Sequence, residues 1–194
     1  VGVRIEHPQK MIDLSQYGDT TLPLPAAAYK LTASSSDGRG VYTFCMCPGG
    51  YVVNASSEQG YLAVNGMSYH DRAGENANSA VVVTVSPEDF GGSGALSGVA
   101  FQRKLEKAAF EAGDGLVPIQ LFQDFCQGKI TENLGEITPQ IKGGYAFGNV
   151  RGIFPEEISR ALEEGIKAFG RKLPGYDRKD AVLAGVESRT SSPV

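Results

Sequence analysis

The stretch that most constrains the fold runs from Gly40 to Val85, where short β-type runs alternate with turn signals. A β-rich run at Val41–Cys47 is followed by Pro-Gly-Gly and by a second run at Tyr51–Ala55, which predicts a hairpin. Further strands are expected at Tyr61–Asn65 and at the β-branched run Ala80–Val85. Such a series of short strands favours a small β-barrel or a strongly curled sheet, because closure removes unpaired edges.

Two more strands are expected before this stretch, at Val1–Glu6 and Ala27–Ala33, which brings the total to about six. After Pro87 the pattern changes, and apolar residues recur at helical spacing in 98–112 and again from Pro155 to Gly170. The second of these begins with Pro155 and two glutamates, which suit the first turn of a helix.

The order of these elements, strands first and helices later, is typical of the α+β class. Asp180–Glu187 is expected to return as a last strand. We therefore predict a β-barrel part formed by residues 1–87 and 180–194, and a helical subdomain over residues 88–179.

Composition excludes several classes of function. Glycine accounts for 25 of 194 residues, about 13% against roughly 7% in an average protein, which fits a turn-rich β fold. The net charge is −4 and the chain has no tryptophan and no basic stripe, which argues against nucleic-acid binding. No apolar run approaches the roughly 18 residues that cross a membrane. Three cysteines cannot all pair, so we expect a reducing, cytoplasmic setting.

Cys45 and Cys47 lie two residues apart on a predicted strand, so both thiols are expected on one side. Packing as small buried hydrophobes is the favoured interpretation. A metal site would need further ligands, for which Cys126, His7 and His70 are available without ligand spacing. A redox pair is the other alternative, although this spacing is sterically poor for a disulfide. We predict no metal site.

The polar loop Ser68–Ser79 is the main candidate for binding. It is longer than most hairpin connections, and loops of this length are often functional. His70 and Arg72 are candidate binding residues, and the arginine side chain can bind a carboxylate or phosphate with two hydrogen bonds. Asn76 and Asn78 add further hydrogen-bonding groups. The alternative is a solvated loop whose asparagines bond to their own backbone.

A glycine-rich segment, Gly92–Gly98, follows a strand and precedes a helix, which is where a dinucleotide-binding turn would lie. Its spacing is G-x-G-x-x-x-G, and no second strand with a terminal acidic residue follows at the required distance. We interpret it as a linker that leads into the helix, with Ser97 as a helix cap. The residues alone show no self-contained catalytic set.

Four segments carry a resemblance to a known family: GVRIEHPQ (2–9), VYTFCMCPGG (41–50), VNGMSYHDRAGENANSA (64–80) and DAVLAGVESRTSSPV (180–194). The resemblance covers essentially the whole chain. The chain resembles a family of large bacterial FAD-dependent dehydrogenases of uncharacterised activity, related to flavoproteins with an inserted domain. In that family an FAD-binding domain is split by an insert that pairs a small β-barrel with a helical part, and this chain is similar to the insert alone.

The resemblance implies hydride or electron transfer at a flavin. It implies FAD in the longer parent protein and none bound to this fragment, whose two ends look cut from a longer chain. The expected partners are the FAD-binding domain of the same protein and an unknown small-molecule substrate, with no nucleic acid and no membrane. The loop Ser68–Ser79 and the return segment Ser188–Pro193 are expected to face the cofactor, and no catalytic residue can be carried over. The candidate substrate- or flavin-facing residues are His70, Arg72, Asn76, Asn78, Thr190 and Ser191.

We therefore expect the insert, or substrate-side, domain of an FAD-dependent oxidoreductase, inactive on its own. The alternative from a different class is a non-catalytic module that binds a protein or a ligand. Flavin content of the full-length protein discriminates between them.

Overall fold

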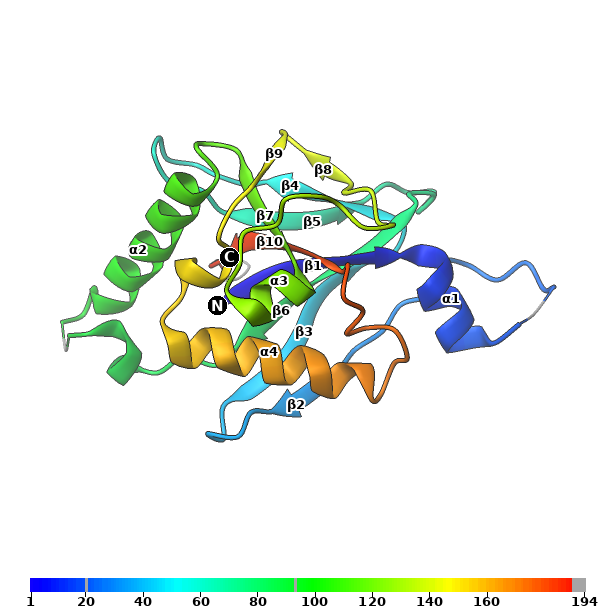
Figure 1. Cartoon of the computed structure of the whole chain (residues 1–194), viewed down its shortest axis with the longest axis horizontal. Helices are drawn as coiled ribbons and strands as arrows, with labels where there is room; N and C mark the ends of the chain where they lie inside the picture. The colour runs from blue at the N-terminus through cyan, green and yellow to red at the C-terminus, as the bar shows by residue number, and fades with distance from the viewer. Residues whose placement is uncertain (20, 93, 190–194) are drawn as a thin grey trace.

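The computed structural model describes residues 1–19, 21–92 and 94–189, in which the chain forms a mixed α+β fold, as the sequence predicts (Figure 1). The strands are β1 (Gly2–Pro8), β2 (Thr32–Ser34), β3 (Gly40–Cys47), β4 (Gly50–Asn54), β5 (Val64–Ser68), β6 (Asn76–Val83), β7 (Val117–Leu121), β8 (Ile141–Lys142), β9 (Tyr145–Phe147) and β10 (Val182–Glu187). The helices are α1 (Gln9–Tyr17), α2 (Ser97–Ala112), α3 (Phe122–Gln127) and α4 (Glu156–Gly170), with two 3-10 helices, η1 (Pro87–Phe90) and η2 (Arg151–Ile153).

β1 lies at the centre of the larger sheet, whose strand order is β2-β3-β6-β1-β10-β7-β9. It pairs antiparallel with β6 on one side and with β10 on the other. Gly2, at the start of β1, therefore lies opposite Glu187, at the end of β10 (Figure 1). We call this the Gly2 end of the sheet, and the end where β1 finishes at Pro8 the Pro8 end.

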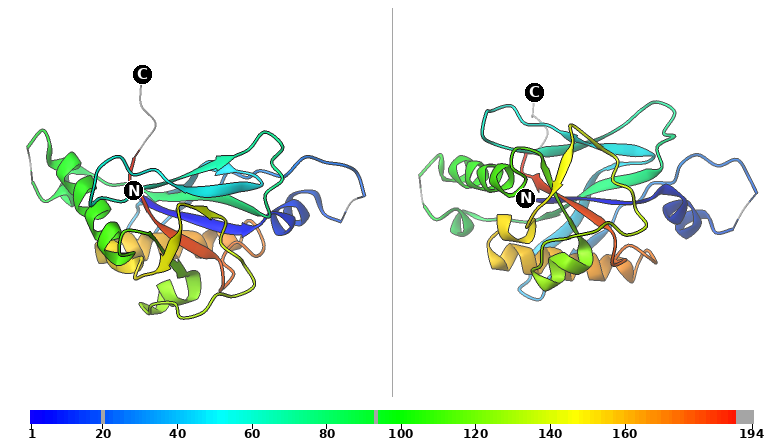
Figure 2. Two further views of the ribbon diagram at one scale, coloured as in Figure 1. Left: turned by 90° about the horizontal axis from the view of Figure 1, so that it is seen from above. Right: turned by 45° about the horizontal axis from the view of Figure 1, so that its top comes forward.

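A second sheet of three strands, in the order β5-β4-β8, stacks on the larger one. Figure 2 (left) shows the small sheet on one side of β1 and α4 on the other. The predicted barrel is wrong, because within the described residues the strands form two separate sheets. The predicted hairpin is wrong as well, because β3 pairs with β2 and β6 whereas β4 pairs with β5 and β8.

The chain leaves the larger sheet at the corner Pro48–Gly50. The register of β3 shifts between Phe44 and Cys47, which adds one residue and bends the strand. Gly49 then takes a φ of +47° and lies against the backbone carbonyl of Arg72, where a Cβ atom would clash. A proline followed by two glycines suits such a corner as well as it suits a hairpin turn, so the local sequence does not distinguish the two.

The two faces of the larger sheet differ because side chains alternate along β1. Val3 and Ile5 belong to the apolar core on the face that α4 covers. Arg4 and Glu6 point to the other face, toward the small sheet, and both are fully buried. We call the space between the two sheets the interlayer.

The predicted helices are confirmed at α2 and α4, and the apolar stripe of α4 is buried as expected: Ile158, Leu162, Ile166 and Phe169. Leu96 rather than Ser97 occupies the cap position of α2. The last predicted strand is β10, whereas the strand expected at Ala27–Ala33 is limited to β2. Residues 88–179, predicted as helical, also supply β7 and β9 to the larger sheet and β8 to the small one.

Candidate functional site

The predicted loop Ser68–Ser79 divides into an exposed turn and a buried strand. His70 and Arg72 lie in the turn and are exposed. Asn76 and Asn78 lie on β6, where both are buried on the interlayer face. The structure therefore separates the four loop candidates into two pairs with different surroundings.

The turn is fixed to the corner that links the two sheets. The Gly74 amide donates to the Gly49 carbonyl at 3.0 Å, and the Gly49 amide donates to the side-chain oxygen of Gln9 at 2.7 Å. Arg72 has a φ of 50°, which a non-glycine residue adopts only when its surroundings enforce it. The conformation of the turn is thus fixed by hydrogen bonds to the corner Pro48–Gly50.

Arg4 is the centre of the interlayer. Its guanidinium donates to Glu187 at 2.8 Å, to the Asn78 side-chain oxygen at 3.1 Å and to the Asn65 side-chain oxygen at 2.7 Å. A further hydrogen bond of 2.7 Å reaches the carbonyl of Cys45. These partners come from β10, β6, β5 and β3, so one side chain connects both sheets.

The electrostatics of this cluster follow from burial. Burial opposes the charge on Arg4, but Glu187 more than offsets that effect, so the pKa of Arg4 lies above its usual value. Burial raises the pKa of Glu187, and the Arg4 guanidinium opposes the rise. Gly66 of β5 lies directly over Arg4 and Asn78, where any Cβ atom would clash. The cluster is therefore closed off and leaves no room for a ligand.

Glu6 lies at the Pro8 end of the same face. One carboxylate oxygen accepts from the Asn76 amide group at 3.0 Å and from the Gln140 backbone at 2.9 Å. The other oxygen has no hydrogen-bond partner among the described residues. Burial raises the pKa of Glu6 to about 7, against the lowering effect of Asn76 and Gln140.

Neither Arg4 nor Glu6 was a candidate from the sequence. The signal was present, because the run VGVRIEH alternates apolar and charged residues with the period of a strand. The same alternation is also expected for a strand whose charged face is exposed to solvent. In the structure the small sheet covers that face of β1, which buries Arg4 and Glu6.

The two close cysteines lie in different environments, because the register shift in β3 falls between Phe44 and Cys47. Cys47 is buried, its sulfur lies 3.9 Å from the Arg4 guanidinium, and burial raises the pKa of its thiol. Cys45 is exposed, so the predicted core packing is wrong for Cys45 and confirmed for Cys47. Across residues 1–19, 21–92 and 94–189, no group of three His, Cys, Asp or Glu side chains could hold a metal ion.

A hollow with a volume of about 540 Å³ lies at the Pro8 end. It is bounded by the start of α1, the exposed turn with Arg72, the start of β6 with Asn76, and the segment 136–138. We call it the Arg72 hollow.

An uncovered strip of the larger sheet lies at the Gly2 end. Tyr42 and Phe44 of β3 are 39% and 42% exposed on the face that the small sheet covers elsewhere. Val82, Glu187 and Arg189 complete the strip around a shallow hollow of about 110 Å³. We call it the open strip.

Arg189, beside the open strip, is held in place by α2. Its guanidinium donates to both carboxylate oxygens of Glu106, at 2.8 and 2.7 Å, and Ser188 donates to the same carboxylate. Burial would raise the pKa of Glu106, but these hydrogen bonds outweigh it and lower the pKa to about 2. Thr190 and Ser191, predicted to face the cofactor, lie outside the described residues.

The exposed turn and Ser188, the first residue of the predicted return segment, lie at opposite ends of β1. The Arg72 hollow is at the Pro8 end and Ser188 is at the Gly2 end. Six residue steps along a strand correspond to roughly 20 Å. The structure therefore places Ser188 far from the Arg72 hollow.

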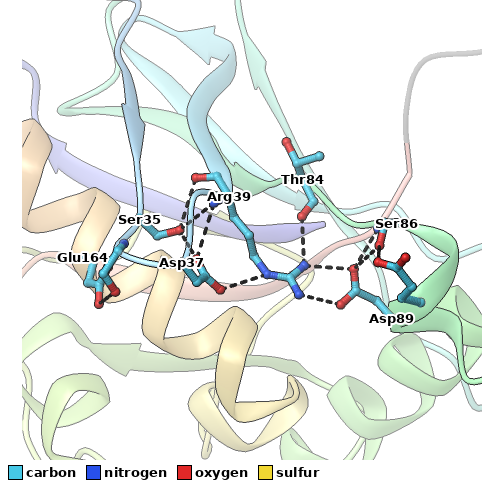
Figure 3. Close-up of polar contacts among 9 residues, drawn as sticks. Ser35, Asp37, Arg39, Thr84, Ser86, Asp89 and Glu164 are labelled. Carbon is cyan, nitrogen blue, oxygen red and sulfur yellow. Dashed lines mark hydrogen bonds and ion pairs between the residues drawn. The ribbon is translucent and has the colours of Figure 1, made fainter.

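A third polar group lies where β3 begins and β6 ends (Figure 3). Arg39 binds both carboxylate oxygens of Asp89 at 2.9 and 2.8 Å, binds Asp37 at 3.1 Å, and donates to the Thr84 carbonyl. Asp89 in turn accepts from the Ser86 backbone at the start of η1. Because Arg39 is fully engaged in connecting these turns, we assign it a structural role.

No helix in the described part of the chain is long and apolar enough to cross a membrane. The fold and these sites define an α+β domain with two stacked sheets, a charged interlayer, and separate surface features at the two ends of its central strand.

Comparison with known proteins places this domain in a family. Residues 1–190 match the family described as FAD-dependent protein, C-terminal domain-like, and the chain belongs to that family. An uncharacterised protein of Clostridium beijerinckii is 52% identical over 199 aligned residues, which cover all of this chain. The chain spans 37% of the length of that relative. The resemblance predicted from the sequence is confirmed at the level of the family.

Proposed function

We propose that this chain is the substrate-side domain of an FAD-dependent oxidoreductase and that another part of the longer protein holds the flavin. The observation that carries this proposal is the open strip, together with the family to which the chain belongs. An exposed apolar patch rimmed by charged residues is typical of an interaction surface.

The open strip alone does not fit an entire FAD molecule. The hollow at the open strip measures about 110 Å³, well below the roughly 300–1,000 Å³ of ordinary ligand sites. The glycine-rich segment at 92–98 lacks the spacing that would hold a pyrophosphate. We therefore propose that the open strip packs against the flavin-binding part, where Tyr42 and Phe44 supply aromatic contacts. When bound there, the flavin would supply the hydride or electron chemistry.

The proposal is tested by the flavin content of the full-length protein. We expect it to purify with a visible flavin absorption band, and the isolated chain to purify without one. Changing Tyr42 and Phe44 together to serine is expected to weaken flavin retention in the full-length protein. The matched control is Leu116→Ser, because Leu116 is also 42% exposed but precedes β7 near the other edge of the larger sheet.

A second candidate is a ligand-binding module without redox chemistry. The observation in its favour is that the Arg72 hollow, with about 540 Å³, lies at the Pro8 end, away from the open strip. A full-length protein that holds no flavin after incubation with FAD would favour this candidate and contradict the oxidoreductase.

A further inference from the structure

The Arg72 hollow is a preformed cavity. Its volume of about 540 Å³ falls within the range of small-molecule sites. Hydrogen bonds connect its walls: the Gln9 backbone donates to the Glu75 carbonyl at 2.8 Å, and the Gln9 side chain accepts from Gly49 at 2.7 Å. The Glu136 backbone donates to Asp180 at 3.0 Å on the opposite wall. The walls are therefore in position before any ligand binds.

Asn76 forms the back of the hollow, and its orientation is determined by two acceptors. Its amide nitrogen donates to Glu6 at 3.0 Å and to the Thr138 carbonyl at 2.9 Å. The Thr138 carbonyl can only accept a hydrogen bond, so it must face the amide nitrogen, which therefore points inward. Asn76 is only 4% exposed and lines the hollow, and its oxygen accepts no hydrogen bond from the described residues. The back of the hollow thus presents one amide oxygen without a hydrogen-bond partner among the described residues, and a ligand can reach it.

Some of the charged side chains around the hollow form hydrogen bonds or ion pairs with other residues, whereas others form no ion pair among the described residues. Asp13 accepts hydrogen bonds from Gln9 and from the Ala27 backbone, and Glu136 pairs with Arg178 at 2.8 Å. Lys10 and Arg72 form no ion pair within the described part of the chain, and neither does Glu75. Two cations and one carboxylate are therefore available to a ligand. A guanidinium suits a carboxylate because it can donate two parallel hydrogen bonds.

We propose that the Arg72 hollow binds a small carboxylate that also carries a hydroxyl or amino group. Arg72 and Lys10 bind the carboxylate, while the oxygen of Asn76 accepts from the hydroxyl or amino group. Glu75 favours an ammonium at the same position. This site does not depend on the proposed flavin chemistry, because it lies roughly 20 Å from the open strip along β1.

The test uses three acids with the same four-carbon skeleton: succinate, L-malate and L-aspartate. They share both carboxylates and differ only in having hydrogen, hydroxyl or ammonium at one carbon. Binding to the full-length protein is measured by calorimetry. We expect malate and aspartate to bind at least about tenfold more tightly than succinate, because only they satisfy Asn76. Equal affinity for all three, or no saturable binding of malate and aspartate, would overturn the proposal.

Variants locate the site. Arg72→Gln is expected to weaken malate binding about tenfold or more, because it removes a charge-assisted contact. The control Arg103→Gln, on the exposed face of α2, should leave the affinity unchanged. Unchanged affinity in Arg72→Gln would also overturn the proposal. Flavin absorption is recorded for the same samples: a normal flavin band without acid binding contradicts this site alone, whereas a missing band contradicts the oxidoreductase.

Discussion

The two faces of the larger sheet achieve burial in opposite ways. On the face that α4 covers, Val3 and Ile5 join an apolar core in which burial itself is favourable. On the interlayer face, Arg4 and Glu6 are equally buried, and burial is tolerated only because hydrogen bonds replace water. One face is therefore held by packing and the other by specific pairing. The two faces should respond differently to the same kind of substitution.

The largest effect is expected for Arg4→Met. Removing the guanidinium leaves Glu187 buried without its partner, which should lower the free energy of unfolding by about 3–5 kcal/mol. The double variant Arg4→Met with Glu187→Leu should lose clearly less, because neither charge remains. Urea unfolding of the purified chain measures the free energy of unfolding of the single and the double variant. A double variant no more stable than the single one would show that the pair is not the origin of the loss.

Leu162→Ala on the other face should cost about 3 kcal/mol, because a fully buried side chain of α4 is replaced by a cavity. No partner substitution of the kind used for Arg4 should restore it. The same unfolding experiment applies. A loss below about 1 kcal/mol would mean that this face is less tightly packed than the structure shows.

Neighbouring residues on the two faces give opposite pH dependence. Glu6 has a pKa of about 7 in the folded chain against 4.5 ordinarily, so the folded state binds more protons between those values. Its contribution to stability therefore falls as pH rises from 4.5 to 7. His7, buried on the α4 face, has its pKa lowered to about 4 by burial, so stability falls as pH drops from 6.5 to 4.

Each effect amounts to about 3 kcal/mol, and the two partly cancel in the wild type. Glu6→Gln should leave a stability that rises with pH through the His7 window, and His7→Gln should leave one that falls through the Glu6 window. Unfolding curves at several pH values distinguish these slopes. Parallel pH profiles for wild type and both variants would contradict the assigned burial.

The smallest effect is expected at an exposed ion pair that belongs to neither face. Arg103 and Glu58 are each more than 40% exposed at the side chain, so solvent screens their interaction. Arg103→Gln should leave the urea midpoint of unfolding unchanged within experimental error. A clear drop in that midpoint would show that an exposed ion pair contributes to stability in addition to the two buried faces.

The sequence predicts the elements better than it predicts their pairing. α2, α4 and β10 follow from local periodicity, which depends on residues close in the chain. The central pairings of β1 join it to residues 76–82 and 182–187, and no local pattern specifies such distant partners. The barrel was wrong for this reason, together with the ambiguity of the Pro48–Gly50 corner.

The candidate site was partly predictable. Arg72 and Asn76 were candidates from the sequence, and both line the Arg72 hollow. Asn76 and Asn78 were assigned to a loop because polar residues rarely fill a buried strand, yet they lie on β6. A strand that faces the charged interlayer needs polar side chains to form hydrogen bonds, and so does a loop that faces water. Composition alone therefore cannot distinguish such a strand from a loop. His70 is exposed in the turn, and its role remains a prediction.

The most direct test of the central claim compares visible absorption spectra of the full-length protein and of this chain alone, each purified after incubation with FAD. The account predicts a flavin band in the full-length protein, a weaker band when Tyr42 and Phe44 are both changed to serine, and no band in the isolated chain. A full-length protein without flavin, or an isolated chain that retains it, would contradict the account.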